Sequence, residues 1–328
     1  MAAFAPARIL ARCRYNCTYT PAAVAAPKPV DAMLNWSLLA LKLSARLPLP
    51  VSHACGSAAG WLASWLPIEQ THVADVNLAI CFPELLPRER RRLRRQSMAH
   101  LGCMITESGR MWLRPAEETL ALVREVRGRE QLEAAWQQGR GLILASPHIG
   151  CWEIAGLWCS RHFPMHSMYK PQPGAIDDII RQSRERAGAR LVPTDASGVR
   201  GLLKALRQQE AVGILPDRAA KTGSVFSPFF GRERLTPTLA SKLALRTGAP
   251  VIFAMGERLP WGRGYRLHFV PAEPEIASPD EKTAARALSQ SLEKCIRSLP
   301  GQYWWTYKLF RRPPPGLKKP YKKKNTNA

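Results

Sequence analysis

From about residue 120 onward, the chain contains short runs that are apolar or that alternate between apolar and polar residues. Between these runs lie stretches in which apolar residues recur every three or four positions. Runs of the first kind predict β-strands and stretches of the second kind predict amphipathic helices. We expect strands at residues 120–126, 142–146, 166–170, 211–216, 251–257 and 265–270, with helices between them that include 129–138, 175–187 and 199–209. This alternation is typical of an α/β fold with a mostly parallel or mixed central sheet flanked by helices.

The N-terminal third has a different pattern. Residues 69–115 are helical, with a break at Phe82-Pro83. Residues 33–66 are apolar, but Lys, Arg and Pro interrupt them, so no clean run of strongly apolar residues is long enough to span a bilayer. They carry three tryptophans near cationic residues, which is typical of the lipid headgroup zone: Trp36, Trp61 and Trp65. We therefore expect N-terminal membrane-associated helices that anchor the chain, with an ordinary core helix as the alternative.

Composition divides the chain into four parts. Residues 1–32 are rich in Ala and Pro and lack an apolar core with a cleavage site, so a signal peptide is not expected. We expect them to be a disordered arm or a non-native leader before a true start at Met33. Residues 33–66 form the expected anchor, 67–316 the main domain and 317–328 a basic tail.

The formal net charge of +23 indicates an anionic partner. Six arginines lie between Arg88 and Arg95, and the C-terminal tail forms a second basic cluster. Nucleic acid, a membrane surface, a phosphorylated substrate and an acidic protein all fit this charge. No zinc finger, RNA-binding aromatic signature or basic zipper occurs, so a nucleic-acid partner is not expected.

The eight cysteines include no Cys-x-x-Cys motif, so the sequence predicts neither a zinc site nor a disulfide framework, and a reducing compartment is the default. No His, Cys and Asp cluster has metal-ligand spacing, so we expect no metal and no cofactor.

The segment "LILASPHIGCWEIAG" at 142–156 contains the strongest candidate for chemistry. Pro147 ends the apolar strand and a helical pattern begins near Trp152, so His148 is predicted at a strand-to-helix turn. From there its ring can fold back toward Glu153, near free amides at the start of the helix. A base, a carboxylate that orients it and an anion-binding amide cluster would suit acyl transfer. A capping histidine beside a solvated glutamate is the alternative.

Spacing alone does not decide between these interpretations, because His268 and Glu273 stand at the same separation. His268 lies in an alternating strand, where an odd offset places two side chains on opposite faces. We therefore interpret His268 as structural. Cys151, three residues after His148, is the rival nucleophile, and we interpret it as a core residue at the start of the helix.

Further segments resemble a known family: "NLAICFPEL" (77–85), "YKP" (169–171), "RQSRERAGARLVP" (181–193), "GILPDRAAKTGSVFSPFFGRERLTPTLASKLALRTGAPV" (213–251) and "GQYWWTYKLFRRPPPG" (301–316). Together with "SPHIGCWE" they are similar to the bacterial lipid A late acyltransferases, the lauroyl and myristoyl transferases. The resemblance runs from about Met33 to Gly316. It implies a glycerolipid-acyltransferase-like fold and transfer of an acyl chain from acyl carrier protein to a hydroxyl of a phosphorylated glycolipid, at the cytoplasmic face of the bacterial inner membrane.

The resemblance also implies roles for single residues. His148 would be the general base and Glu153 would hold its imidazole, without a covalent acyl-enzyme. Arg184 and Asp217 match functional positions of the family, and Lys170 stands where Arg is frequent, which would give a phosphate a point charge instead of a bidentate partner.

The loop after Asp217 departs from the commoner family pattern, which leaves the role of that loop open. Two other functions are alternatives: an acyl-CoA-dependent transferase that acts on another glycolipid or aminolipid, and a non-enzymatic basic protein that binds membranes or nucleic acid.

Overall fold

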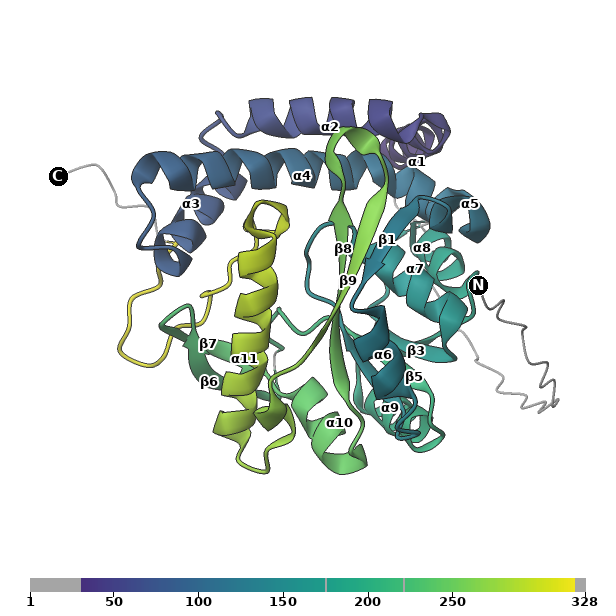
Figure 1. Cartoon of the computed structure of the whole chain (residues 1–328). Coiled ribbons are helices and arrows are strands. Elements are labelled where there is room, and N and C mark those ends of the chain that lie inside the picture. The colour runs from purple at the N-terminus through teal and green to yellow at the C-terminus, as the bar shows by residue number, and fades with distance from the viewer. Residues whose placement is uncertain (1–30, 175, 221, 322–328) are drawn as a thin grey trace.

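The protein is built around a seven-stranded sheet with the strand order β1-β9-β8-β2-β5-β3-β4 (Figure 1). The computed structural model describes residues 31–174, 176–220 and 222–321, and the side chains from residue 38 onward. The expected leader therefore lies outside the described residues except for its last two positions. The sheet strands are β1 (Val123–Arg127), β2 (Leu142–Ala145), β3 (Met165–Tyr169), β4 (Ala189–Pro193), β5 (Ala211–Ile214), β8 (Val251–Arg258) and β9 (Tyr265–Pro271).

The sheet is mixed, as expected. Five neighbouring strands, β8, β2, β5, β3 and β4, are parallel. β9 pairs antiparallel with β8 and parallel with β1, so these two strands run the other way. All six expected strands are confirmed. The alternation did not reveal β4, or the separate hairpin formed by β6 (Ser224–Phe229) and β7 (Arg232–Pro237).

Both faces of the sheet are buried, which explains why β2 is apolar throughout. Leu142 and Leu144 face one core cluster, and Ile143 and Ala145 face the other. The covering helices are α5 (Ala116–Leu120), α6 (Arg129–Trp136), α7 (Trp152–His162), α8 (Ile176–Glu185), α9 (Ala196–Arg207), α10 (Leu239–Thr247) and α11 (Glu281–Ser298), with short 3-10 turns η1 (Pro260–Gly262), η2 (Pro274–Ala277) and η3 (Pro300–Gln302). Side-chain caps define some of their ends: Asp195 accepts hydrogen bonds from the first turn of α9, and Asp280 from Thr283 N at 2.9 Å.

Four helices precede the sheet: α1 (Asp31–Arg46), α2 (Leu49–Ala63), α3 (Glu69–Cys81) and α4 (Pro87–Leu113). Figure 1 shows α2 lying along α4 at one end of the sheet. The two helices touch backbone to backbone, because a Cβ added at Gly56 would lie 2.5 Å from the carbonyl oxygen of Gly102, and one at Gly60 would lie 2.0 Å from that of Met98. The break expected at Phe82-Pro83 is the connection between α3 and α4.

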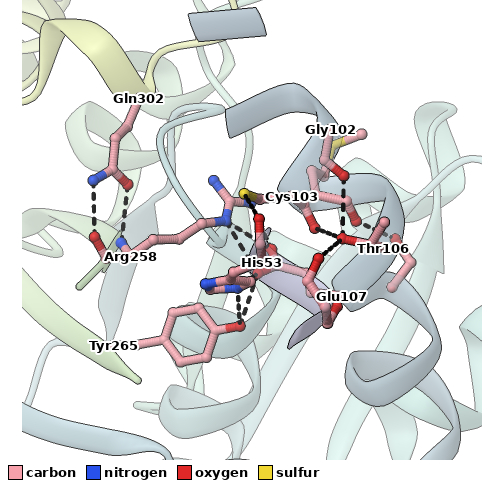
Figure 2. Close-up of polar contacts among 11 residues, drawn as sticks. His53, Gly102, Cys103, Thr106, Glu107, Arg258, Tyr265 and Gln302 are labelled. Atoms are coloured by element: carbon pink, nitrogen blue, oxygen red, sulfur yellow. Dashed lines mark hydrogen bonds and ion pairs between the residues drawn. The ribbon is translucent and has the colours of Figure 1, made fainter. Parts of the chain in front are cut away.

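A buried polar network also ties α2 to the sheet (Figure 2). Glu107 of α4 contacts His53 Nε2 of α2 at 2.8 Å and accepts a hydrogen bond from Tyr265 Oη of β9 at 2.7 Å. Arg258 of β8 donates to the same carboxylate from Nε at 3.0 Å and from Nη2 at 2.5 Å. All four side chains are buried. Residues 49–63 are therefore in direct contact with α4 and, through this network, with the sheet.

No helix within residues 31–174, 176–220 and 222–321 combines the length and apolar character needed to cross a bilayer. The outer side of α1, α2 and the turn after α2 nevertheless exposes large apolar side chains that include Leu43, Trp61, Leu62 and Trp65. The Trp36 side chain lies outside the described part of the chain. Membrane association of the N-terminal helices therefore stays a prediction.

Candidate active site

His148 lies where β2 gives way to α7, as the sequence predicted, and it meets Asp217 there. Asp217 follows β5, which is the parallel neighbour of β2, so both residues sit at the carboxyl edge of the sheet. His148 Nδ1 lies 2.8 Å from Asp217 Oδ1, and the backbone N–H of His148 donates to Oδ2 at 3.1 Å. Both side chains are buried.

The protonation state of Asp217 determines which imidazole nitrogen carries the proton. Burial raises the pKa of Asp217, but the charge and hydrogen bonds of His148 and the charge of Arg218 outweigh it, and the pKa falls to about 2. The carboxylate is therefore ionised and can only accept hydrogen bonds. His148 therefore donates from Nδ1, and in the neutral form of the imidazole this leaves the lone pair on Nε2 available to act as a base.

The turn that carries His148 is held from two sides. The N–H of Gly150 donates to Gln302 O at 2.9 Å, and that of Cys151 donates to Gly256 O at 2.7 Å. Gly150 has a φ of +56°, and a Cβ there would lie 2.1 Å from Gly256 O, so the position requires glycine. Trp304 N donates to the carbonyl of His148 at 3.1 Å. The histidine backbone is therefore fixed before any ligand binds.

Two tryptophans flank the imidazole. The ring of Trp152 packs edge-to-face against His148 at a centroid distance of 4.8 Å, and that of Trp304 at 5.5 Å. The two indoles stack on each other at 5.4 Å. Arg218 lies 4.5 Å above the Trp304 ring and 4.6 Å from the Tyr307 ring. This aromatic wall fixes the orientation of His148 and limits access of water to it.

Glu153 does not occupy the expected position beside the imidazole. It forms an ion pair with Arg184 instead, with Arg184 Nη2 at 2.5 Å and Nε at 3.1 Å from the two carboxylate oxygens. The physical reason is that Glu153 lies in the first turn of α7, facing the last turn of α8, whereas Asp217 reaches the histidine from the neighbouring strand. The structure therefore brings His148 together with Asp217, and Glu153 together with Arg184.

An open cavity lies beside this ion pair, and the empty space within its lining, including the part open to solvent, is about 800 Å³. Glu153, Arg184 and Trp152 contribute to its wall, and most of the remaining lining is apolar or small, including Met111, Leu144, Leu157, Met165, Met168 and Ile214. It lies between α7, α8 and the face of the sheet. An elongated apolar group fits such a lining.

The other candidates differ in what surrounds them. Lys170 is exposed at the end of β3. Cys151 is buried, and burial raises the pKa of its thiol well above the ordinary value, so it lacks the thiolate that a nucleophile needs. His268 lies on β9 as expected, and its Nε2 contacts Glu257 at 2.8 Å, away from His148 and Asp217. Within the described residues, no group of three or more His, Cys, Asp or Glu side chains could hold a metal ion.

Sequence reasoning missed three residues around the histidine. Trp304 and Arg218 belong to segments that the resemblance had singled out, yet nothing in the sequence indicates that they stack on each other. Arg234 of β7 is buried, lies 3.5 Å from the centre of the Phe229 ring and donates from Nη1 to the carbonyl oxygen of Asp217 at 3.3 Å. The "FFGRERLTP" segment could have signalled this arginine, because charged residues are rare next to buried aromatic residues.

The chain is similar to known proteins along most of its length. Residues 27–312 match the family described as Bacterial lipid A biosynthesis acyltransferase. The chain is 30% identical over 291 residues to the lipid A biosynthesis lauroyltransferase of Escherichia coli strain K12, which covers 88% of this chain and 94% of that protein. It is 30% identical over 286 residues to the palmitoleoyltransferase of the same strain, covering 86% and 92%. A phosphatidylinositol mannoside acyltransferase of Mycobacterium tuberculosis strain H37Rv is 29% identical over 190 residues, covering 56% and 58%.

Proposed function

Because this chain belongs to the bacterial lipid A biosynthesis acyltransferase family, we propose that it transfers a fatty acyl chain from acyl carrier protein to a hydroxyl group of a lipid A precursor. The observation that carries the proposal is the buried His148–Asp217 pair at the carboxyl edge of the sheet, in contact with Trp152, which contributes to the wall of an apolar cavity. A base with a free lone pair beside a site for an apolar chain is what transfer of a fatty acyl group to a hydroxyl requires.

In the proposed reaction, His148 Nε2 takes the proton from the acceptor hydroxyl while its oxygen attacks the thioester carbonyl carbon. The ionised Asp217 stabilises the imidazolium that forms. When the tetrahedral intermediate collapses, the carbon–sulfur bond breaks and the imidazolium returns the proton to the departing thiolate. The products are an ester and the free thiol of the carrier protein, so protons balance without an acyl-enzyme. The buried, protonated thiol of Cys151 supports this direct route.

We propose that the cavity beside the Glu153–Arg184 pair takes the acyl chain of the donor. Its apolar lining favours a hydrocarbon, which gains about 0.8 kcal/mol for each buried CH₂ group.

The Glu153–Arg184 pair lies in the wall of this cavity. The two side chains are partly buried, and the ion pair between them keeps both in a fixed position. We propose that Glu153 and Arg184 position the donor in this way, and that the exposed Lys170 meets a phosphate of the acceptor.

Two measurements test the proposed function. The purified protein, given acyl carrier protein loaded with a labelled fatty acid and a lipid A precursor, is expected to produce a precursor heavier by one acyl chain. Mass spectrometry of lipid A from a strain without the gene is expected to show one missing secondary acyl chain. Two results together would contradict the proposed function: normal lipid A in that strain, and transfer by the purified protein from acyl-CoA to a mannosylated or amino-acid lipid.

We propose that the carrier protein docks on the exposed arginines of α4. Arg90 donates to the carbonyl of Leu85, Arg94 pairs with Asp75, and Arg95 lies over Trp65. The remaining three, Arg88, Arg91 and Arg92, are exposed and make no ion pair within the described residues. They are free to meet an acidic partner, and Figure 1 shows their helix at the opposite end of the molecule from α9.

Replacing Arg88, Arg91 and Arg92 with Glu is expected to raise the KM for the acylated carrier protein and to remove most of its salt dependence. The reason is that attraction between opposite charges is screened over roughly 8–10 Å at physiological ionic strength. Steady-state kinetics at several salt concentrations measure the effect. The same charge change at Arg200, Lys204 and Arg207 on α9 is the control. Equal KM changes in both triple variants would contradict docking on α4.

We also propose that the outer side of α1 and α2 lies on the cytoplasmic face of the inner membrane, whose anionic lipids suit a basic protein. Trp261 of η1, at the tip of the β8–β9 hairpin, belongs to this surface. It is 88% exposed, and its neighbour Gly262 packs against Pro50 at the start of α2, where an added Cβ would lie 2.4 Å from Pro50 Cα. Figure 1 shows the hairpin reaching α2. The indole therefore extends the apolar surface of the helices.

Replacing Trp61, Leu62 and Trp261 with Gln is expected to release the protein from vesicles of anionic phospholipid. Burial of each side chain in a bilayer contributes about 1.5–3 kcal/mol, so the triple change costs several kcal/mol of binding free energy. Vesicle co-sedimentation measures it, and a thermal unfolding curve checks that the fold is intact. Changing Leu245 and Leu317, which are also exposed and line neither cavity, to Gln is the control. Undiminished vesicle binding of the first variant would defeat the membrane proposal.

A further inference from the structure

A second, smaller cavity lies on the other side of Trp152, between α4 and the segment that follows η3. The empty space within its lining, including the part open to solvent, is about 230 Å³. His148, Trp152 and Trp304 contribute to the lining, together with α4 residues and with Arg258 at the end of β8. Trp152 contributes to the walls of both cavities. The smaller cavity is the one that has His148 in its wall.

Two polar groups in the lining of this cavity have unused hydrogen-bonding capacity. The Nδ1 atom of His100 is buried and has no hydrogen-bond partner among the residues that the structure describes. Burial and the nearby charge of Arg258 lower the pKa of His100 to about 3, so its ring is neutral at physiological pH. Buried polar atoms are rarely left unpaired, so the unpaired ring nitrogen of a residue that lines a cavity indicates a missing partner.

Arg258 is the second group. Its Nε and Nη2 atoms are used by Glu107, but Nη1 makes no hydrogen bond within the described part of the chain (Figure 2). The charge of Glu107 balances that of the guanidinium, and both are buried. The free edge therefore remains a hydrogen-bond donor while the pair as a whole has little attraction for an anion.

The lining thus selects for a neutral oxygen-bearing group. A phosphate would lose its hydration and meet a neutral imidazole and an already balanced arginine, which do not compensate for that loss. A hydroxyl or carbonyl oxygen flanked by hydrocarbon fits, since Leu101, Met104 and the two tryptophans provide apolar contacts around the two polar groups.

We propose that the smaller cavity is the acceptor subsite: it holds the hydroxyl-bearing part of the acceptor lipid, with a neutral oxygen bound by His100 and Arg258. This inference rests on the proposed acyl transfer and specifies where each substrate lies. The donor chain enters the larger cavity, the acceptor enters the smaller one, and the two meet at His148 and Trp152. A base must come within about 2.6–3.2 Å of the oxygen that it deprotonates, which the position of His148 in the cavity wall allows.

His100→Phe tests the subsite, because phenylalanine keeps a ring and removes the polar nitrogens. Loss of one hydrogen bond is expected to raise the KM for the acceptor roughly three- to ten-fold. The KM for the acylated carrier protein is expected to stay within about two-fold, and the pH profile to keep its shape, because His148 and Asp217 are untouched. His268→Phe, which changes a histidine outside both cavities, is the matched control and should leave both constants unchanged.

Met104→Trp provides a second variant in case the first folds poorly, since it fills the cavity from α4 and keeps His100. It should also raise the KM for the acceptor selectively. An unchanged acceptor KM in either variant that folds as stably as the unmodified protein overturns the subsite, and so does a rise in the carrier-protein KM alone. Absence of any transfer by the unmodified protein would instead defeat the proposed function, so the two failures are distinguishable.

Discussion

His148→Ala is expected to lower the kcat of acyl transfer by about 100- to 10,000-fold, the usual range for loss of a general base. In the structure, Asp217 fixes the proton on Nδ1, so Nε2 is the atom that can accept the hydroxyl proton. Alanine removes that atom and leaves both cavities open to substrate. The KM values are therefore expected to change much less than kcat, which single-turnover and steady-state measurements can separate.

His268→Ala is the control for this prediction. It breaks the half-buried contact with Glu257, and should leave kcat within about two-fold, because neither residue lines either cavity. Equal losses of activity in the two alanine variants, with both proteins folded, would show that His148 is not the base.

The same kinetic measurements distinguish the role of Asp217 from that of Glu153. Asp217→Asn is expected to lower kcat more than Glu153→Gln does. An asparagine at 217 no longer stabilises the imidazolium and can accept the wrong tautomer of His148. Glu153→Gln weakens the hold on Arg184 and is expected to act mainly through the KM for the donor. The opposite order would restore Glu153 to the role that the sequence suggested.

The position of His148 could be predicted because it depends on local chemistry. Pro147 ends a strand and an amphipathic pattern starts a few residues later, so the turn is determined within the segment itself. The partner of His148 could not be predicted in the same way. Asp217 is 69 residues away, and the contact exists because β2 and β5 are neighbours in the sheet, which no local pattern encodes. Glu153, five residues from His148, is closer to it in the sequence than Asp217 is. In the structure, however, Asp217 contacts the imidazole and Glu153 pairs with Arg184.

The N-terminal helices show a second limit of sequence reasoning. Residues 49–65 are apolar and carry tryptophans, as a membrane anchor does. The glycines among them, however, are explained by contact with another helix. Gly56 and Gly60 are needed because the backbones of α2 and α4 are in contact. The tryptophans face outward, where the membrane prediction still applies. A periodic pattern alone does not distinguish a face that meets a helix from one that meets lipid.

The strands that the pattern missed have weak signals for physical reasons. β4 contains Arg190 and ends at Pro193 as the edge strand of the sheet, where an unpaired backbone and polar side chains are tolerated. The β6–β7 hairpin includes Pro228 and several polar residues because one side is partly open to solvent. The buried strands β2, β5 and β8 were predicted because burial on both faces requires continuous apolar runs.

Glu107→Leu is expected to destabilise the protein by about 3–5 kcal/mol, because it leaves the buried guanidinium of Arg258 without an anion. His53 and Tyr265 lose their partner in the same change, so α2 is held less firmly against the sheet. Denaturant unfolding measures the loss. Glu133→Leu, which breaks the exposed pair with Arg129, is the control and should cost at most about 1 kcal/mol. Similar losses in both variants would show that the buried network has no special weight.

The pH dependence of unfolding gives the same network a second, independent test. Burial raises the pKa of Glu107, but the charge of Arg258 and the hydrogen bonds from His53 and Arg258 lower it further, to well below the ordinary value. A depressed pKa means that the carboxylate stabilises the fold fully above the unfolded-state pKa of about 4.3 and loses this contribution as the pH falls further. Glu107→Leu should therefore show a smaller drop in stability between about pH 5 and pH 2 than the unmodified protein.

The double variant Glu107→Leu/Arg258→Met should recover much of the stability at pH 7, since apolar side chains replace a buried ion pair at little cost. A double variant as unstable as Glu107→Leu would mean that the helix packing around Gly56 and Gly102, and not the unpaired charge, sets the loss.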